Sequence, residues 1–204
     1  RLDFNENTLG PSQKVYEAIK DINLNQISIY PEYNLLKKFV SNHYYESRQF
    51  DSEEIGLFNG ADAAINAIFN SFGDRDEIFL TTNPTFGYYS PCSEIQGMRK
   101  ITCAYEGENF LFPIKRFKEK IIKHKPKLIF ICNPNNPTGT VLSAQEIIKL
   151  ANLNKKSLIV VDELYEKFNG DSLLPVIDFK KIKNIVVIQS LSKTAGLAGL
   201  RIGF

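Results

Sequence analysis

Apolar residues occur along this chain in two patterns, as short continuous runs and as longer stretches with apolar positions three or four residues apart. The runs predict five strands, at residues 77–81, 99–104, 127–132, 157–162 and 184–189. In the segments 128–131 and 158–161 every residue is apolar. This pattern is typical of parallel strands that helices cover on both faces.

The stretches between the runs predict helices. Residues 113–123 place Ile114, Phe117 and Ile121 at helical spacing. Ser143, followed three residues later by Glu146, predicts a capping box that opens another helix. Because strands and helices alternate, we expect an α/β fold with a mostly parallel sheet flanked by helices. In such folds ligands bind beyond the carboxyl ends of the strands.

Composition narrows the classes of partner. With 25 basic and 23 acidic residues, the chain has no charge excess that would indicate a nucleic-acid or anionic-membrane partner. Its three cysteines are widely spaced in apolar surroundings, which argues against a disulfide framework and favours a cytoplasmic location. The chain begins without methionine and stops inside an apolar segment, so we expect it to be part of a longer protein.

Polar residues follow several of the predicted strands. After the short run 55–58, Gly60 opens a predicted helix at 63–69, whose first N–H groups could approach a phosphate. A plain turn and helix start would explain the same residues. The loop 133–139 contains three asparagines, two prolines and a glycine, which suit either a ligand site or a tight connection.

Two further strand ends carry ionisable side chains. Asp162 ends a buried run, where a carboxylate needs a cationic or donor partner. A protonated pyridine nitrogen would serve, and Tyr165 could reach the same ring. Capping of the following helix is the alternative for Asp162. Lys193 follows the run 185–188, together with Ser190 and Ser192, and this group could hold an aldehyde cofactor and its phosphate. An ordinary surface charge is the alternative for Lys193.

Three other kinds of site can be set aside. Residues 190–193 match the S-x-x-K signature of serine β-lactamase-like enzymes, but the accompanying S-D-N and K-T-G elements are missing. A phosphate-binding P-loop would require glycines where Val187 and Ser192 stand. His43 and His124 lack the spacing of metal ligands, so we expect no metal site.

Several of these motifs occur in one recognisable order. They are Gly60-Ala61-Asp62, Pro84-Thr85-Phe86, the loop 133–139, Asp162-Glu163-Leu164-Tyr165, Ser190-Leu191-Ser192-Lys193 and Arg201. In this order they resemble the class I/II aminotransferases of pyridoxal-phosphate fold type I. The opening residues 2–7 and the pair Tyr30-Pro31 further resemble the histidinol-phosphate aminotransferase branch. The resemblance implies a pyridoxal-phosphate (PLP) transferase large domain, truncated before the C-terminal small domain.

The resemblance also implies a role for each matched residue. Lys193 would be the catalytic residue, forming a Schiff base with PLP and then acting as general base and acid. Asp162 would pair with the pyridinium nitrogen, while Asn136 and Tyr165 would bind the phenolic oxygen. Phe86, where the branch often has tyrosine, would stack on the cofactor ring.

The remaining matched residues would bind the cofactor phosphate. They are Ala61, Asp62, Ser190, Ser192, Arg201 and Tyr30. Tyr30 would reach the site of the neighbouring subunit, which implies a homodimer. A tyrosine packed in a turn before proline is the alternative for Tyr30.

The expected reaction is transamination between L-histidinol phosphate and 2-oxoglutarate in histidine biosynthesis, so the partners are a small amino donor and a 2-oxo acid. Residues 1–28 would lie near the substrate site and residues 29–204 would form the PLP-binding domain, incomplete at its C-terminal end. The family's substrate-binding arginine would lie beyond residue 204. Four alternatives are a PLP-dependent decarboxylase of phospho-amino acids, another aminotransferase of the class, the effector domain of a transcriptional regulator, and a non-catalytic relative.

Overall fold

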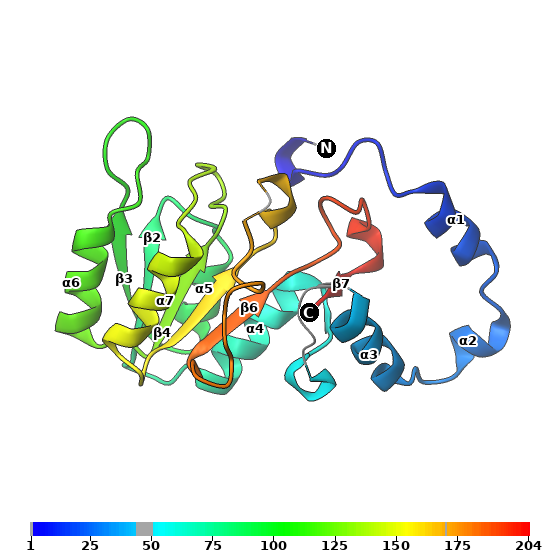
Figure 1. Cartoon of the computed structure of the whole chain (residues 1–204), viewed down its shortest axis with the longest axis horizontal. Helices are drawn as coiled ribbons and strands as arrows, with labels where there is room; N and C mark the ends of the chain where they lie inside the picture. The colour runs from blue at the N-terminus through cyan, green and yellow to red at the C-terminus, as the bar shows by residue number, and fades with distance from the viewer. Residues whose placement is uncertain (1, 44–50, 170) are drawn as a thin grey trace.

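A five-stranded parallel sheet forms the centre of the computed structural model, which describes residues 2–43, 51–169 and 171–204 (Figure 1). The strands lie in the order β3-β2-β4-β5-β6. Their bounds are Ile78–Asn83 (β2), Arg99–Ala104 (β3), Leu128–Cys132 (β4), Leu158–Asp162 (β5) and Ile185–Ile188 (β6). The predicted α/β architecture with a mostly parallel sheet is therefore confirmed, and each strand lies at its expected run.

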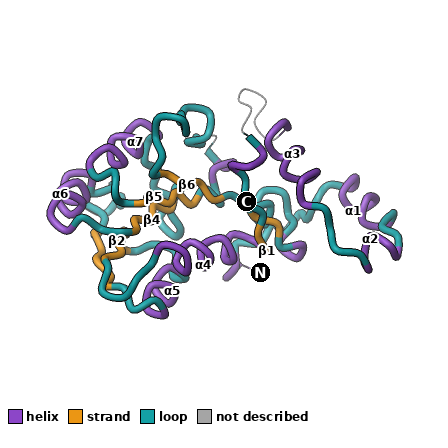
Figure 2. The backbone as a smooth tube through the Cα atoms, turned by 90° about the horizontal axis from the view of Figure 1, so that it is seen from below, coloured by secondary structure: helices purple, strands orange, loops and turns teal. Residues whose placement is uncertain are grey.

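Helices cover both faces of this sheet, as the apolar runs require (Figure 2). On one face lie α6 (Ile114–His124) and α7 (Ala144–Leu153), which bury Phe117 and Ile147 against the strands. On the other face lie α4 (Gly60–Phe72) and α5 (Tyr89–Ile95), whose Phe69 and Tyr89 pack on Phe130 of β4. All five residues of β4 are buried, so this strand is the middle of the core.

Two short strands form a second, two-stranded sheet next to β6. β1 (Phe58–Asn59) and β7 (Ile202–Gly203) pair antiparallel. Backbone bonds between Gln189 and Phe204, at 2.7 and 3.0 Å, join β7 to the chain just beyond β6. A Cβ atom at Gly203 would lie 2.5 Å from the backbone of Gly60, so a residue without a side chain is needed at this crossing.

Two details of the predicted helices need correction. Helix α4 begins at Gly60 rather than at residue 63, so that Gly60, Ala61 and Asp62 form its first turn. Before α7, Ser143 Oγ accepts the Glu146 N–H at 3.3 Å as expected. The Glu146 carboxylate, however, pairs with lysines on α6 and α7, so only half of the predicted capping box forms.

The N-terminal segment extends away from the sheet as an arm (Figures 1 and 2). It consists of a 3-10 turn η1 (Leu2–Phe4) and the helices α1 (Gln13–Lys20), α2 (Leu24–Ser28) and α3 (Tyr33–His43). The 3-10 turns η2 (Ser52–Glu54), η3 (Glu166–Phe168) and η4 (Ala198–Leu200) complete the described elements. Nowhere in the described ranges is a helix both long and apolar enough to cross a membrane.

Candidate active site

A cavity of about 520 Å³ lies where the loops after β4, β5 and β6 meet the first turn of α4. The N-terminal residues 3–6 line one part of this cavity. Its other lining residues include Ala61, Asp62, Phe86, Asn136, Leu164, Tyr165, Ser192, Lys193, Gly199 and Arg201. The structure thus brings the predicted site residues to one place, with Asp162, Ser190 and Tyr30 as the exceptions. Its position agrees with the expectation that ligands bind beyond the carboxyl ends of the strands.

Lys193 projects into this cavity from the loop after β6. Its Nζ donates a hydrogen bond to the carbonyl oxygen of Phe4 at 2.6 Å, which links the loop after β6 to the N-terminal segment. Partial burial lowers the pKa of Lys193, and the nearby Arg201 adds to this effect, whereas Asp62 and Glu6 oppose it. A lysine with a lowered pKa is more readily available as a neutral amine, which is the form that attacks an aldehyde or accepts a proton.

A helix start and an arginine lie together at the α4 end of the cavity. The first turn of α4 presents its N–H groups there, and Arg201 lies beside it with Nη2 3.4 Å from Asp62 Oδ2. A Cβ at Gly60 would lie 2.4 Å from Arg201 Nη2, so the glycine makes room for the guanidinium. A helix N-terminus next to an arginine fork is suited to a phosphate group. Asp62 lies in this first turn, and its side chain also contacts Arg201.

The two serines of the Lys193 loop occupy different positions. Ser192 lines the cavity, whereas Ser190 lies behind it and donates to the carbonyl oxygen of Ile202 at 2.9 Å. The two hydroxyl oxygens are 2.8 Å apart, and the Ser192 N–H donates to Ser190 Oγ at 3.1 Å. Ser190 therefore anchors the turn that presents Ser192 and Lys193.

The loop after β4 offers one of its three asparagines to the cavity. Asn133 exchanges two hydrogen bonds with the backbone of Leu142, and Asn135 binds the side chains of Thr85 and Thr138. These two asparagines hold the loop together, as the turn interpretation predicts. Asn136 lines the cavity, as the ligand-site interpretation predicts.

Tyr165 and Phe86 line other parts of the cavity wall. The Tyr165 hydroxyl accepts a hydrogen bond from Asn5 Nδ2 at 3.0 Å, and burial raises the pKa of this phenol. Phe86 packs edge-on against Tyr89, with ring centroids 5.5 Å apart. Both aromatic residues are thus held in place by neighbours that motif spacing alone did not identify.

Asp162 lies behind the cavity wall and is only 2% exposed. Its Oδ1 accepts the N–H of Leu164 at 3.2 Å, and its Oδ2 accepts the hydroxyl of Tyr89 at 2.6 Å. Burial raises the pKa of Asp162, and the Tyr89 hydrogen bond opposes this rise. The helix-capping alternative does not hold, because the following 3-10 turn begins at Glu166 with Tyr165 in the N-cap position.

Sequence reasoning missed three contributors to this site: the Phe4 carbonyl, the Asn5 amide and the Tyr89 phenol. For Tyr89 the one available signal was its position three residues after Phe86, on the first turn of a helix. Tyr30 lies elsewhere in the described chain, on the arm between α2 and α3, and is 96% exposed.

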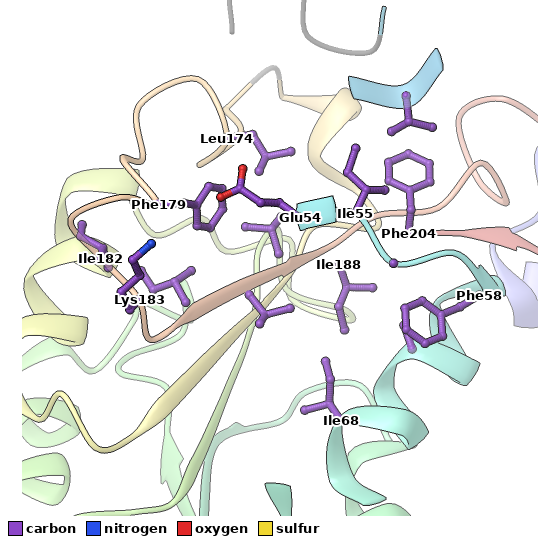
Figure 3. Close-up of a pocket in the computed structure, with 16 residues that line it drawn as sticks. Glu54, Ile55, Phe58, Ile68, Leu174, Phe179, Ile182, Lys183, Ile188 and Phe204 are labelled. Atoms are coloured by element: carbon purple, nitrogen blue, oxygen red, sulfur yellow. The ribbon is translucent and has the colours of Figure 1, made fainter. Parts of the chain in front are cut away.

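A second cavity, of about 420 Å³, lies on the far side of β6 and is mainly apolar (Figure 3). Ile68, Phe179, Ile188 and Phe204 are among its lining residues, and Glu54 and Lys183 are its charged members. The first cavity, by contrast, combines an amine, a guanidinium, carboxylates and amides. The polar and ionisable groups of the first cavity therefore make it the candidate active site.

The chain has clear relatives. The family model for aminotransferase class I and II matches residues 1–204. The histidinol-phosphate aminotransferase of Caldanaerobacter subterraneus subsp. tengcongensis is 35% identical over 100% of this chain and 57% of its own length. That of Clostridium novyi is 34% identical over 100% of this chain and 56% of its own length. The chain thus spans a little more than half the length of these curated relatives.

A solved structure shows the same fold. The histidinol-phosphate aminotransferase from Sinorhizobium meliloti, determined in complex with pyridoxal-5'-phosphate, matches 98% of this chain and 53% of its own. The TM-score is 0.85 at 22% sequence identity. Together with the family model, which covers every residue, these comparisons show that the chain belongs to the class I and II aminotransferases.

Proposed function

We propose that this chain is the cofactor-binding part of a PLP-dependent histidinol-phosphate aminotransferase, which exchanges an amino group between L-histidinol phosphate and 2-oxoglutarate. The observation that carries the proposal is the convergence of Lys193, Arg201, Asn136 and Tyr165 on one cavity. The identity of about one third to histidinol-phosphate aminotransferases along the whole chain supports the choice of substrate.

The chemical groups that line the cavity match those that PLP requires. The helix start and Arg201 suit its phosphate, and the space left by the missing side chain of Gly60 brings the guanidinium over that helix start. Lys193 supplies the amine that an aldehyde requires. When bound, PLP supplies an electron sink that stabilises negative charge on the amino-bearing carbon of the substrate.

The residues of the chain provide the rest of the chemistry. Lys193 Nζ, with its lowered pKa, takes up the proton from the amino-bearing carbon of the substrate. The buried Asp162 provides the negative charge that keeps the ring nitrogen of the cofactor protonated. Phe86 would pack on the ring face, while Asn136 and Tyr165 would hold the ring through its phenolic oxygen. The N-terminal residues 3–6 close part of the wall and limit access of water to Lys193.

The domain division and the assembly belong to the same proposal. Residues 1–28 would form an N-terminal segment near the substrate site, of which residues 3–6 line the cavity, and residues 29–204 would form the PLP-binding domain. Tyr30 acts in the site of a second subunit of a homodimer, which accords with its 96% exposure on the N-terminal arm. The three cysteines are free and buried, which supports a cytoplasmic location for the enzyme.

The experiment is a comparison of cofactor binding in three forms of the intact protein. With PLP, the wild type should show the visible absorbance of the bound cofactor, and borohydride should fix the cofactor covalently on Lys193. Lys193→Ala should lose this attachment. Lys183→Ala, a lysine of the apolar cavity, is the matched control and should retain it. A wild type that never binds PLP in this way would refute the proposal.

The substrate is tested by adding amino donors to the PLP-loaded enzyme. Histidinol phosphate should convert the cofactor to its amine form, and 2-oxoglutarate should restore it. Aromatic amino acids and phosphothreonine should leave the spectrum unchanged. Release of carbon dioxide from phosphothreonine would instead identify a decarboxylase.

A further inference from the structure

The buried contact between Tyr89 and Asp162 connects two elements that are far apart in the sequence. Tyr89 is the first residue of α5, Asp162 is the last residue of β5, and 73 positions separate them. The hydroxyl donates to Asp162 Oδ2 at 2.6 Å, a distance typical of a strong bond to a charged acceptor. The exposed fractions of the two residues are 1% and 2%.

The Tyr89 ring has little freedom to move. It lies against Phe86, with centroids 5.5 Å apart, and against Phe130, with centroids 4.9 Å apart. Phe86 lines the active-site cavity and is the residue expected to contact the cofactor ring. Tyr89, which binds Asp162, therefore also packs directly against this residue. A rigid phenol can aim its O–H bond more reproducibly than a long aliphatic side chain can aim a donor.

The charge arrangement favours a neutral phenol that donates a hydrogen bond to the carboxylate. Burial raises the pKa of Tyr89 well above its usual value, and the charge of Asp162 raises it further. The proton therefore stays on the phenol oxygen. On Asp162, burial raises the pKa, and the bond from Tyr89 is the largest effect in the opposite direction. The bond from Leu164 N occupies the other carboxylate oxygen, so each oxygen has one protein donor and retains accepting capacity.

We propose that Tyr89 is a positioning residue that holds the Asp162 carboxylate ionised and aimed at the ring nitrogen of the cofactor. This inference rests on the PLP-dependent function proposed above. It assigns to Tyr89 an effect that passes through Asp162 and involves no direct contact with substrate.

The test removes one hydroxyl group. Tyr89→Phe keeps the packed ring and leaves Asp162 Oδ2 without its donor. In the intact protein, PLP affinity should fall by about tenfold or more, because the lost bond is to a charged acceptor. The pH at which the visible absorbance of the bound cofactor changes should shift as well, since the ring nitrogen loses its ionised partner. Equilibrium dialysis and a spectroscopic pH titration measure the two effects.

Two variants show whether the effect passes through Asp162. Tyr105→Phe is the matched control, because Tyr105 is a half-buried phenol that also has a polar partner, Thr82, but lies outside the cavity lining. It should bind PLP as the wild type does. In an Asp162→Asn background, Tyr89→Phe should change PLP affinity by less than about twofold, because neighbouring residues that act through one another are not additive.

Folding is checked by circular dichroism and urea denaturation of the cofactor-free proteins. If Tyr89→Phe does not fold, Tyr89→His, which retains an aromatic ring with an N–H donor, takes its place and should bind PLP more tightly than Tyr89→Leu. Unchanged affinity and an unchanged pH titration in Tyr89→Phe would overturn the inference, as would equal losses with and without Asp162. A wild type that fails to bind PLP would refute the proposed function, which is a separate outcome.

Discussion

Glu163 is a buried carboxyl group next to Asp162 that the proposed chemistry does not use. Its oxygens accept bonds from Ser172 Oγ at 2.6 Å, from Leu173 N at 2.6 Å and from Gln189 Nε2 at 2.9 Å. Burial raises its pKa from 4.5 to about 7, although these three donors oppose the rise. The nearby Glu166 raises the pKa further. Glu163 therefore ties the end of β5 to the end of β6 with a group that titrates near neutral pH.

This shift predicts how stability depends on pH. Between about pH 4.5 and about pH 7 the unfolded chain has released the Glu163 proton, whereas the folded chain retains it. The free energy of unfolding contributed by this group is therefore fully present below about pH 4.5 and is lost as the pH rises through 7. A shift of this size corresponds to roughly 3 kcal/mol. Glu163→Gln has no such proton, so it should gain stability relative to the wild type as the pH rises.

Urea denaturation of both proteins at about pH 5 and about pH 8 measures this difference. The wild type and Glu163→Gln should be closest in stability at the lower pH. A difference that stays constant across the range would show that the carboxyl is ionised throughout. Glu106→Gln, at an exposed ion pair, is the control and should show a much smaller change.

At the residue scale, the sequence predicted which residues line the cavity better than it predicted their hydrogen-bond partners. Lys193 and Asp162 could be found because polar groups at the ends of buried runs are unusual. Their contacts could not, because the bonds from Tyr89 to Asp162 and from Lys193 to Phe4 span 73 and 189 positions. Such pairs depend on strand order and helix placement, which local patterns do not encode.

Two serines at helix starts allow a prediction at the scale of an element. Ser143 before α7 and Ser12 before α1 have nearly the same extended backbone conformation. Ser143 Oγ accepts the Glu146 N–H, whereas within the described residues Ser12 accepts no capping bond. Ser143→Ala should therefore lower the free energy of unfolding by about 1 kcal/mol.

Ser12→Ala is the matched control and should have a smaller effect. Urea denaturation of the cofactor-free protein measures both variants, and PLP affinity should stay unchanged in Ser143→Ala because the site lies elsewhere. Equal losses in the two variants would show that serine contributes through its backbone conformation rather than through the capping bond.

The elements differ in how well a sequence can reveal them. The five parallel strands could be predicted because each is a run of apolar residues that must be covered on both faces. The strands β1 and β7 have two residues each, and β7 pairs only because Gly203 can approach Gly60 closely. Pairing that depends on a close backbone approach leaves no periodic signal. Helix α4 starts three residues before the predicted residue 63, because its first residue is a glycine, which more often ends a helix than begins one.

At the scale of the whole molecule, residues 16–36 of the N-terminal arm are exposed throughout. Leu24, Ile27, Ile29 and Tyr30 are 82%, 71%, 65% and 96% exposed. The arm lies beside the compact sheet rather than over it (Figure 2). A run of apolar side chains on a projecting segment is typical of a surface that meets a partner, and the proposed homodimer supplies one.

A shared active site can be tested by subunit complementation. Lys193→Ala lacks the amine proposed to be catalytic, and Tyr30→Ala lacks the residue proposed to serve the partner's site, so each homodimer should have little activity. A hybrid dimer of the two variants contains one site with Lys193 from one subunit and Tyr30 from the other. Purified through two different affinity tags, this hybrid should regain about half of the wild-type activity. If Tyr30 acted within its own subunit, one site of the hybrid would lack Lys193 and the other would lack Tyr30, and activity would stay near that of the single-variant dimers.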